Sequence, residues 1–202
     1  MYKHQYIERD SKQIYDEKLY GHRAIAFLYS SIREQSPWLF RRLTSARVSS
    51  FLAHQNYEGI LAGKLKDHLN LQHVLNLNAQ ECVDPPEKMD SLRKIFERKI
   101  RYRECRPMPN DPLAIVSPAD ARMLLGSFCD TSGIFIKGKF FDYEEMLGED
   151  KKTWLNVFHE GDFAIFRLTP EKYHYNHTPV AGKVIDFYPI TGSYHACNPN
   201  AV

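Results

Sequence analysis

Two histidines and one aspartate are the residues of this chain whose types and spacing best suit acid-base chemistry. His174 and His177 lie three positions apart, in a segment that follows a predicted strand and ends at Pro179. Imidazole titrates near neutral pH and can both accept and donate a proton. Asp120 also follows a predicted strand, where its carboxylate could orient an imidazole, and an Asp–His pair is two thirds of a triad that activates a nucleophile.

The same three residues support other interpretations. A His-x-x-His pair with an aspartate supplies acceptable ligands for zinc or iron, as a metal-dependent hydrolase would need. Histidines of this kind are also commonly hydrogen-bonded structural residues. The spacing does not separate these alternatives, so from the residues alone they remain open.

Helical periodicity dominates the first half of the chain. From Ser11 to about Glu34, apolar residues recur mostly at three- and four-residue steps, which predicts a helix or a helix pair interrupted near Gly21. Ser36 followed by Pro37 is a helix-start signal and predicts a second helix to about His54. A third helix is predicted from about Pro86 to Ile100, and a strongly basic stretch follows it.

Prolines at 107, 109 and 112 separate this helical half from a second half with a different pattern, because proline lacks an amide donor and restricts the preceding residue. We therefore divide the chain into a helical region, residues 1–106, and a β-rich region, residues 107–202. Short runs of β-branched and aromatic residues predict strands at 113–116, 133–137, 163–168 and 180–187. A helical turn is predicted at Tyr143–Leu147, ended by Gly148. The predicted fold class is α+β, with N-terminal helices before a mainly antiparallel β core.

Composition narrows the function classes. The chain has 202 residues and a net charge of +2, which is too mild for a protein that neutralises nucleic-acid phosphates. It has no apolar stretch of the roughly 18 to 20 residues that span a bilayer and no secretory signal. The four cysteines are widely scattered, which favours reduced thiols in the cytoplasm over zinc ligands or disulfides.

Aromatic and basic residues alternate in the second predicted helix and suit an anionic lipid surface. Rings would lie at the headgroup level and guanidinium groups on phosphates, although an apolar helical stripe commonly packs on its own core. Peripheral membrane association is expected through Trp38, Phe40, Arg41, Arg42 and Arg47.

Residues from about 106 to 202 resemble the phosphatidylserine decarboxylase family. Ala121 stands where that family has glycine, and Lys172 and Tyr175 stand where it has aspartate and arginine. The markers that carry the resemblance occur in the family's order: Ser117-Pro-Ala-Asp-Ala121, Ile136-Lys-Gly-Lys-Phe-Phe141, Leu147-Gly148, Lys172-Tyr-His-Tyr-Asn-His-Thr-Pro179 and Asn198-Pro-Asn-Ala-Val202.

The resemblance implies a lyase of phospholipid biosynthesis that converts phosphatidylserine to phosphatidylethanolamine and carbon dioxide. Members form a pyruvoyl cofactor from a serine by cutting their own chain at a Gly-Ser bond. The resemblance assigns Asp120 and His177 to this cleavage and His174 to decarboxylation. It implies no metal and no nucleic acid. Expected partners are phosphatidylserine, an anionic membrane surface, and either a separate pyruvoyl-bearing small chain or a second copy of this chain.

The family's cleavage serine lies downstream of its Asn-Pro segment, which is where this sequence stops. We therefore expect a core that is incomplete relative to the family and no decarboxylation by this chain alone. Two other Gly-Ser pairs, Leu125-Gly-Ser127 and Gly192-Ser193, lie upstream of the family's site and are predicted to be turns. A catalytically inactive lipid-binding remnant remains an alternative.

Overall fold

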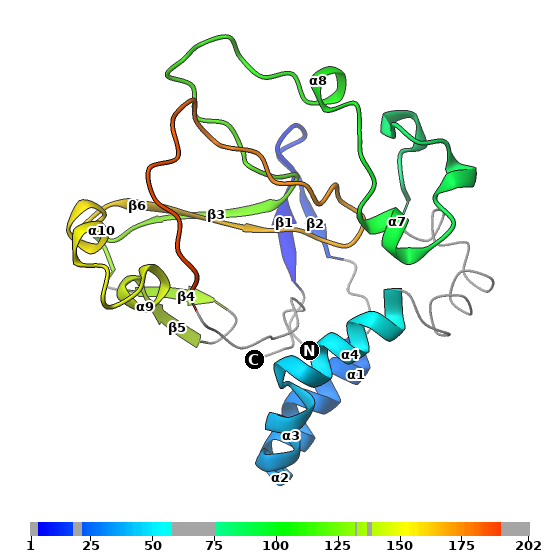
Figure 1. Cartoon of the computed structure of the whole chain (residues 1–202), viewed down its shortest axis with the longest axis vertical. Helices are drawn as coiled ribbons and strands as arrows, with labels where there is room; N and C mark the ends of the chain where they lie inside the picture. The colour runs from blue at the N-terminus through cyan, green and yellow to red at the C-terminus, as the bar shows by residue number, and fades with distance from the viewer. Residues whose placement is uncertain (1–3, 18–21, 58–75, 132, 137–138, 191–202) are drawn as a thin grey trace. The chain divides into compact units, whose positions relative to one another are not determined.

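The computed structural model describes residues 4–17, 22–57, 76–131, 133–136 and 139–190. These residues form short helices and three two-stranded sheets (Figure 1), which confirms the predicted α+β class. The predictions for Lys137-Gly138, Gly192-Ser193 and Asn198–Val202 lie outside the described residues. The division at residues 106 and 107 stays a prediction.

The chain divides into two compact units, which are described separately. Unit 1 consists of Met1–Ser49, Leu124–Ile165 and Pro189–Val202, and unit 2 of Ser50–Met123 and Phe166–Tyr188. Strands β3 (Arg122–Ser127) and β6 (Asp162–Arg167) pair with each other, and the boundary between the units passes through both strands.

Unit 1 begins with an antiparallel hairpin, β1 (Gln5–Ile7) and β2 (Ile14–Asp16), rather than with the helix predicted from Ser11. Tyr6 faces Tyr15 across the pair with ring centroids 5.9 Å apart. Such aromatic cross-strand pairs stabilise a sheet. Residues 14–16 therefore form a strand that pairs with β1, although the spacing of their apolar residues predicts a helix.

The helical predictions hold from there with shorter elements: α1 (His22–Phe27), the π-helical turn η1 (Leu28–Ile32), α2 (Arg33–Gln35), α3 (Pro37–Leu43) and α4 (Ala46–Tyr57). The start at Pro37 is confirmed, although the Ser36 side chain makes no capping hydrogen bond. The predicted second helix is interrupted between α3 and α4. Buried Tyr29 packs edge-on against Phe40, at 5.1 Å between centroids, and so fixes α3 against η1.

The β-rich part of unit 1 contains β4 (Gly133–Ile136) paired antiparallel with β5 (Lys139–Asp142), followed by α9 (Tyr143–Leu147) and α10 (Lys152–Val157). The predicted strands near 133–137 and 163–168 are confirmed as β4 and β6, and α9 ends at Gly148 with φ +94° as predicted.

Three predictions for the region predicted to be β-rich, residues 107–202, are wrong. Leu125-Gly-Ser127 lies in β3 and is not a turn, and the Phe163 ring lies where a Gly126 side chain would stand. The runs at 113–116 and 180–187 contain no strand. Their apolar side chains are largely exposed, because no strand among the described residues pairs with them.

Unit 2 holds the residues of interest. Its elements are the 3₁₀ turns η2 (Ala79–Glu81) and η3 (Pro86–Lys88) and the helices α7 (Leu92–Phe96) and α8 (Tyr102–Cys105). The helix predicted over 86–100 is therefore wrong in extent. Ser91 starts a new helix by accepting a hydrogen bond from the Lys94 amide. The core consists of Cys82, Met89 and Ile95 with Leu77 and Leu92.

Candidate active site

His174 and His177 lie in an extended segment after β6, within unit 2. This segment runs beside the Ser117-Pro-Ala-Asp120 loop. The Val116 amide donates to the Pro179 carbonyl and the His177 amide to the Pro118 carbonyl, each at 2.8 Å. The two sequence motifs are therefore neighbours in space, although more than fifty residues separate them.

The loop that carries Asp120 is fixed from within. The Ser117 hydroxyl donates to the Ala119 carbonyl at 2.7 Å, and the Ala121 amide donates to the same carbonyl at 2.9 Å. Ala121 has no positive φ. The alanine that stands where the family has glycine therefore fits this backbone without strain.

The Asp120 carboxylate is bound by Arg106, which follows α8. Nε of Arg106 lies 3.0 and 3.1 Å from the two carboxylate oxygens, and Nη2 lies 2.8 Å from Oδ2. Nη2 also donates to Glu81 at 3.0 Å. These hydrogen bonds, that with Asp120 foremost, raise the pKa of Arg106. No hydrogen bond joins Asp120 to His174 or His177 in the described part of the chain, so an Asp–His pair stays a prediction.

Each histidine ring lies against an aromatic side chain of a helix end: Phe96 is the last residue of α7 and Tyr102 the first residue of α8. Phe96 contacts His174 with ring centroids 3.9 Å apart, and Tyr102 contacts His177 at 5.0 Å. The Tyr173 ring also stacks on His177, with ring centroids 5.7 Å apart. The rings restrict how the imidazoles can turn.

Burial shifts the pKa values of several groups around His174. Burial lowers the pKa of His174, and the Arg98 guanidinium acts in the same direction, whereas a hydrogen bond with the Lys172 backbone opposes them. Arg98 is itself buried, with Nη1 and Nη2 donating to the carbonyls of Ile95 and Glu171 at 3.0 and 2.6 Å. Burial also lowers the pKa of Arg98 and raises that of Tyr173. His174 is therefore kept neutral at physiological pH.

Two imidazole nitrogens face a missing partner. Nδ1 of His174 and Nε2 of His177 are buried, and neither has a hydrogen-bond partner among the described residues. Buried polar atoms are nearly always hydrogen-bonded in folded proteins, and each exception calls for a partner or a function. These two atoms are thus suited to a polar group supplied from outside the described residues.

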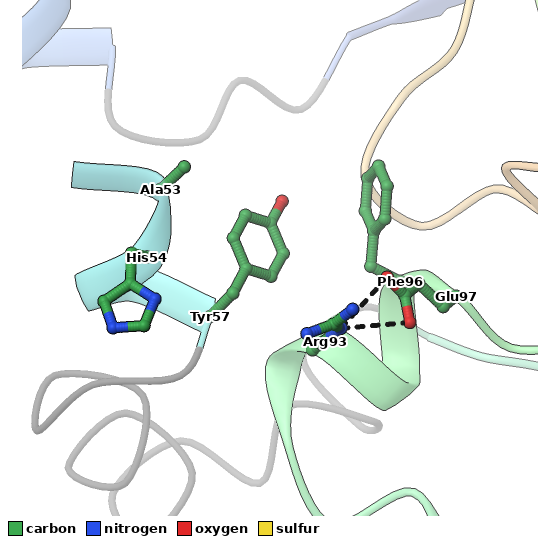
Figure 2. A pocket seen from close by; sticks show the side chains of 6 residues that line it. All are labelled: Ala53, His54, Tyr57, Arg93, Phe96 and Glu97. Atoms are coloured by element: carbon green, nitrogen blue, oxygen red, sulfur yellow. Dashed lines mark hydrogen bonds and ion pairs between the residues drawn. The ribbon is translucent and has the colours of Figure 1, made fainter. Parts of the chain in front are cut away.

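Two cavities of unit 2 adjoin the site. A polar cavity of about 320 Å³ is lined by Arg98, Arg106, Asp120 and Tyr173, among others. A more apolar cavity of about 390 Å³ lies between α4 and α7 (Figure 2). There the rings of Tyr57 and Phe96 approach with centroids 5.7 Å apart. Phe96 therefore contributes both to this cavity and to the contact with His174.

Figure 2 also shows the polar rim of the apolar cavity. Arg93 and Glu97 form an ion pair along α7, with Nε and Oε1 3.1 Å apart, and His54 of α4 lies across from them. The cavity is thus apolar at its aromatic wall and charged at its edge.

The predicted lipid-contact residues lie in α3 and at the start of α4. Trp38, Arg41 and Arg42 are exposed and share one face of α3, since they are spaced three and four residues apart. Phe40 instead packs on Tyr29, and Arg47 is exposed on α4. Among the described helices, none combines the length and the apolar character that a membrane crossing requires.

Sequence reasoning missed several residues of the site: Glu81, Phe96, Arg98, Tyr102 and Arg106. For Phe96, Arg98 and Tyr102 a signal was present, since aromatic and basic residues occur together just before the proline-rich junction. The metal interpretation gains no support from the described residues, in which no three or more His, Cys, Asp or Glu side chains are grouped to hold an ion.

Comparison with known proteins provides an independent finding. The model of the phosphatidylserine decarboxylase family matches residues 92–202. Three phosphatidylserine decarboxylase proenzymes are similar to this chain. The one from Halalkalibacterium halodurans is 36% identical to it over 112 residues, the one from Fusobacterium nucleatum 28% over 200 residues, and the one from Coxiella burnetii 33% over 161 residues. These alignments cover 55%, 98% and 79% of this chain. The chain spans 42%, 64% and 55% of the length of these relatives.

Proposed function

The chain belongs to the phosphatidylserine decarboxylase family, and we propose that it carries the acid-base residues of a pyruvoyl-dependent decarboxylase. The completed protein converts phosphatidylserine to phosphatidylethanolamine and carbon dioxide. The observation that carries this proposal is the pair of buried imidazole nitrogens without partners, Nδ1 of His174 and Nε2 of His177, beside the loop of Asp120.

Both nitrogens fit a reactive group that comes from outside the described residues. A pyruvoyl group, when bound, supplies an electrophilic carbonyl that serves as an electron sink for loss of carbon dioxide from an amino acid. His174 and His177 are the residues that would contact it. The resemblance puts the precursor serine of this group downstream of the residues that correspond to Asn198-Pro199.

His177 and Asp120 serve the formation of the cofactor. Nε2 of His177 is free to take the proton of the serine hydroxyl, as a general base does. Asp120 places a negative charge on the loop whose Pro118 carbonyl holds the His177 backbone.

His174 serves proton transfer during decarboxylation. Because burial lowers its pKa, the imidazole is neutral at rest, and once protonated it is a stronger acid than a free histidine. The Phe96 ring holds it in one orientation. Nδ1 of His174 is thus suited to deliver a proton to the substrate carbon.

The test uses a precursor in which these 202 residues continue into the remaining serine-bearing segment of the Fusobacterium nucleatum relative. Mass spectrometry detects Gly-Ser cleavage and the pyruvoyl group, and release of labelled carbon dioxide from phosphatidylserine vesicles reports decarboxylation. We expect Asp120→Asn and His177→Ala to prevent cleavage, and His174→Ala to permit cleavage but abolish carbon dioxide release. His159→Ala, in the exposed end of unit 1, is the matched control and should behave like the parent.

Other outcomes point elsewhere. A precursor that never cleaves and never releases carbon dioxide would favour the inactive lipid-binding alternative. Full carbon dioxide release by His174→Ala would remove His174 from the mechanism.

Exposed Trp38 beside Arg41 and Arg42 favours α3 as the contact with an anionic membrane surface. Binding to vesicles that contain phosphatidylserine should weaken in Arg41→Gln/Arg42→Gln and strengthen at low salt. The charge-matched control, Arg9→Gln/Arg103→Gln, changes two exposed arginines outside α3. Equal weakening in both double variants would show a general charge effect and remove α3 from the proposal.

A further inference from the structure

Arg106 has more partners than an ordinary surface arginine. Its Nε and Nη2 atoms donate to both oxygens of Asp120, its Nη2 atom donates to Glu81, and its Nη1 atom donates to the Cys105 carbonyl at 2.8 Å. All three guanidinium nitrogens are thus engaged. Bidentate pairing of this kind fixes the plane of a carboxylate as well as its distance.

The partners of Arg106 come from three separate segments. Glu81 ends η2, and its backbone carbonyl accepts the Arg101 amide at 2.9 Å. Arg106 follows α8, and Asp120 lies in the loop to which the His177 segment is hydrogen-bonded. The Arg106 side chain therefore ties the Asp120 loop to η2 and α8, in addition to the backbone contact that the loop makes with His177.

Shielding makes this bridge more than a solvated ion pair. The Asp120 and Glu81 side chains are 21% and 27% exposed, and that of Arg106 is 40% exposed. Exposed pairs contribute little because water and salt screen them, whereas bidentate and partly buried networks are screened less. The two carboxylates also share one guanidinium, so that Glu81 orients Arg106 while Arg106 orients Asp120.

We propose that Arg106 is a positioning residue for Asp120: its bidentate contact sets the orientation of the carboxylate beside the His177 segment, and Glu81 holds the guanidinium in place. This role rests on the proposed function of Asp120 in self-cleavage. Arg106 itself touches no reacting atom, and it acts through Asp120. Lysine cannot replace it, since an ammonium group is a point charge without two parallel donors.

The first test uses this chain alone and needs no catalysis. Amide hydrogen exchange is measured at His177 and Val116, whose amides hold the two motif segments together. Arg106→Ala should speed exchange at both sites by about tenfold, because a bidentate charged contact to the loop is lost. Arg106→Lys should give an intermediate rate, and Glu81→Gln a smaller increase. Exchange of the Phe128 amide, which is bonded to Gly161 in unit 1, should not change.

A double-variant cycle separates the contact from general destabilisation. If Arg106 acts through Asp120, then Asp120→Ala should have the same effect as Arg106→Ala, and the double variant should add nothing further. Lys88→Ala, which removes an exposed cation of η3 in unit 2, is the control. Additive effects, or parental exchange rates in Arg106→Ala, would overturn the proposal.

The second test uses the serine-bearing precursor. Arg106→Ala should slow Gly-Ser cleavage, methylguanidinium should restore part of the rate, and methylammonium at the same concentration should not. Equal rescue by both cations would overturn the orienting role. If the parent precursor does not cleave, the proposed function fails, and the exchange cycle alone then decides whether Arg106 positions Asp120.

Discussion

Replacement of Arg98 by methionine tests how the buried guanidinium supports the histidine segment. Arg98 is 8% exposed and donates to the Ile95 carbonyl at the end of α7 and to the Glu171 carbonyl, three residues before His174. Methionine keeps most of the side chain's length and apolar contact but removes the charge and both hydrogen bonds. The change therefore separates packing from polar support.

The magnitude follows from two opposing contributions. The Glu171 carbonyl is left without a donor, which costs roughly 1–3 kcal/mol, whereas the Ile95 carbonyl still accepts from the backbone amides of Glu97 and Arg98. Against this, the variant no longer buries a cation, whose cost of desolvation is visible in the lowered pKa of Arg98. We expect a net loss of about 1.5 kcal/mol in the local free energy of unfolding. The free energy of unfolding of Arg98→Lys should lie between those of the parent and Arg98→Met, because an ammonium group keeps the charge but does not span both carbonyls.

The assay is native-state hydrogen exchange at two amides of unit 2. The Val83 amide donates to the Lys99 carbonyl, and the Arg101 amide donates to the Glu81 carbonyl. Tryptophan fluorescence would report the other unit, since Trp38 and Trp154 both lie in unit 1. A nuclear magnetic resonance titration of His174 provides a second signal. Its pKa should rise in Arg98→Met, because the Arg98 charge lowers it in the parent. Lys88→Ala, on the exposed surface of η3, is the control.

If the local free energy of unfolding of Arg98→Met lies within about 0.5 kcal/mol of the parent value, as for an uninvolved surface change, Arg98 does not support the histidine segment. A loss of stability without a change in the His174 titration would also contradict the prediction. In that case Arg98 would support the backbone without acting on the imidazole.

Three further predictions concern single groups. Because the His174 pKa is lowered on folding, the unfolded chain binds more protons, so unit 2 should lose stability as the pH falls through about 6.5, at about 1.4 kcal/mol per unit of pKa shift; urea unfolding followed by circular dichroism should show less pH dependence in His174→Gln. His177→Phe removes a buried nitrogen without a partner and should stabilise unit 2 by about 1 kcal/mol in the same assay, while the precursor loses cleavage; a destabilised variant would show that Nε2 has a partner in solution. Gly148→Ala should destabilise unit 1 by about 1 kcal/mol or more, since φ is +94° there, as measured by Trp154 fluorescence. Gly182→Ala, in unit 2 with no atom within 4 Å of the added methyl group, should be neutral when urea unfolding is followed by circular dichroism.

Local signals in the sequence predicted part of the fold. The proline start of α3, the glycine end of α9 and the apolar runs of β4 and β6 each depend on neighbouring residues, and each was predicted near its observed place. Predictions failed where a distant partner decides the structure. Gly126 fits a strand because the Phe163 ring covers it, and 180–187 forms no strand because no partner strand lies beside it in the described part of the chain.

The same distinction holds for the site. His174, His177 and Asp120 were identifiable because their motifs are short and ordered, and the backbone contacts between residues 116–118 and 177–179 place the motifs together. Arg106 and Glu81 were not identifiable, since an ion pair between residues 25 positions apart has no local pattern. The pairing of Phe96 with His174 depends equally on tertiary structure.

The polar groups of the site are satisfied on one side only. Asp120 has a full set of donors from Arg106, and Arg106 is completed by Glu81 and a backbone carbonyl. The two imidazoles are fixed by aromatic rings and backbone bonds, yet a nitrogen of each remains buried without a partner. Such atoms cost free energy in a folded protein, and sites that violate local rules in this way are commonly functional. Unit 2 therefore presents two buried imidazole nitrogens that could bind a polar group from outside the described residues.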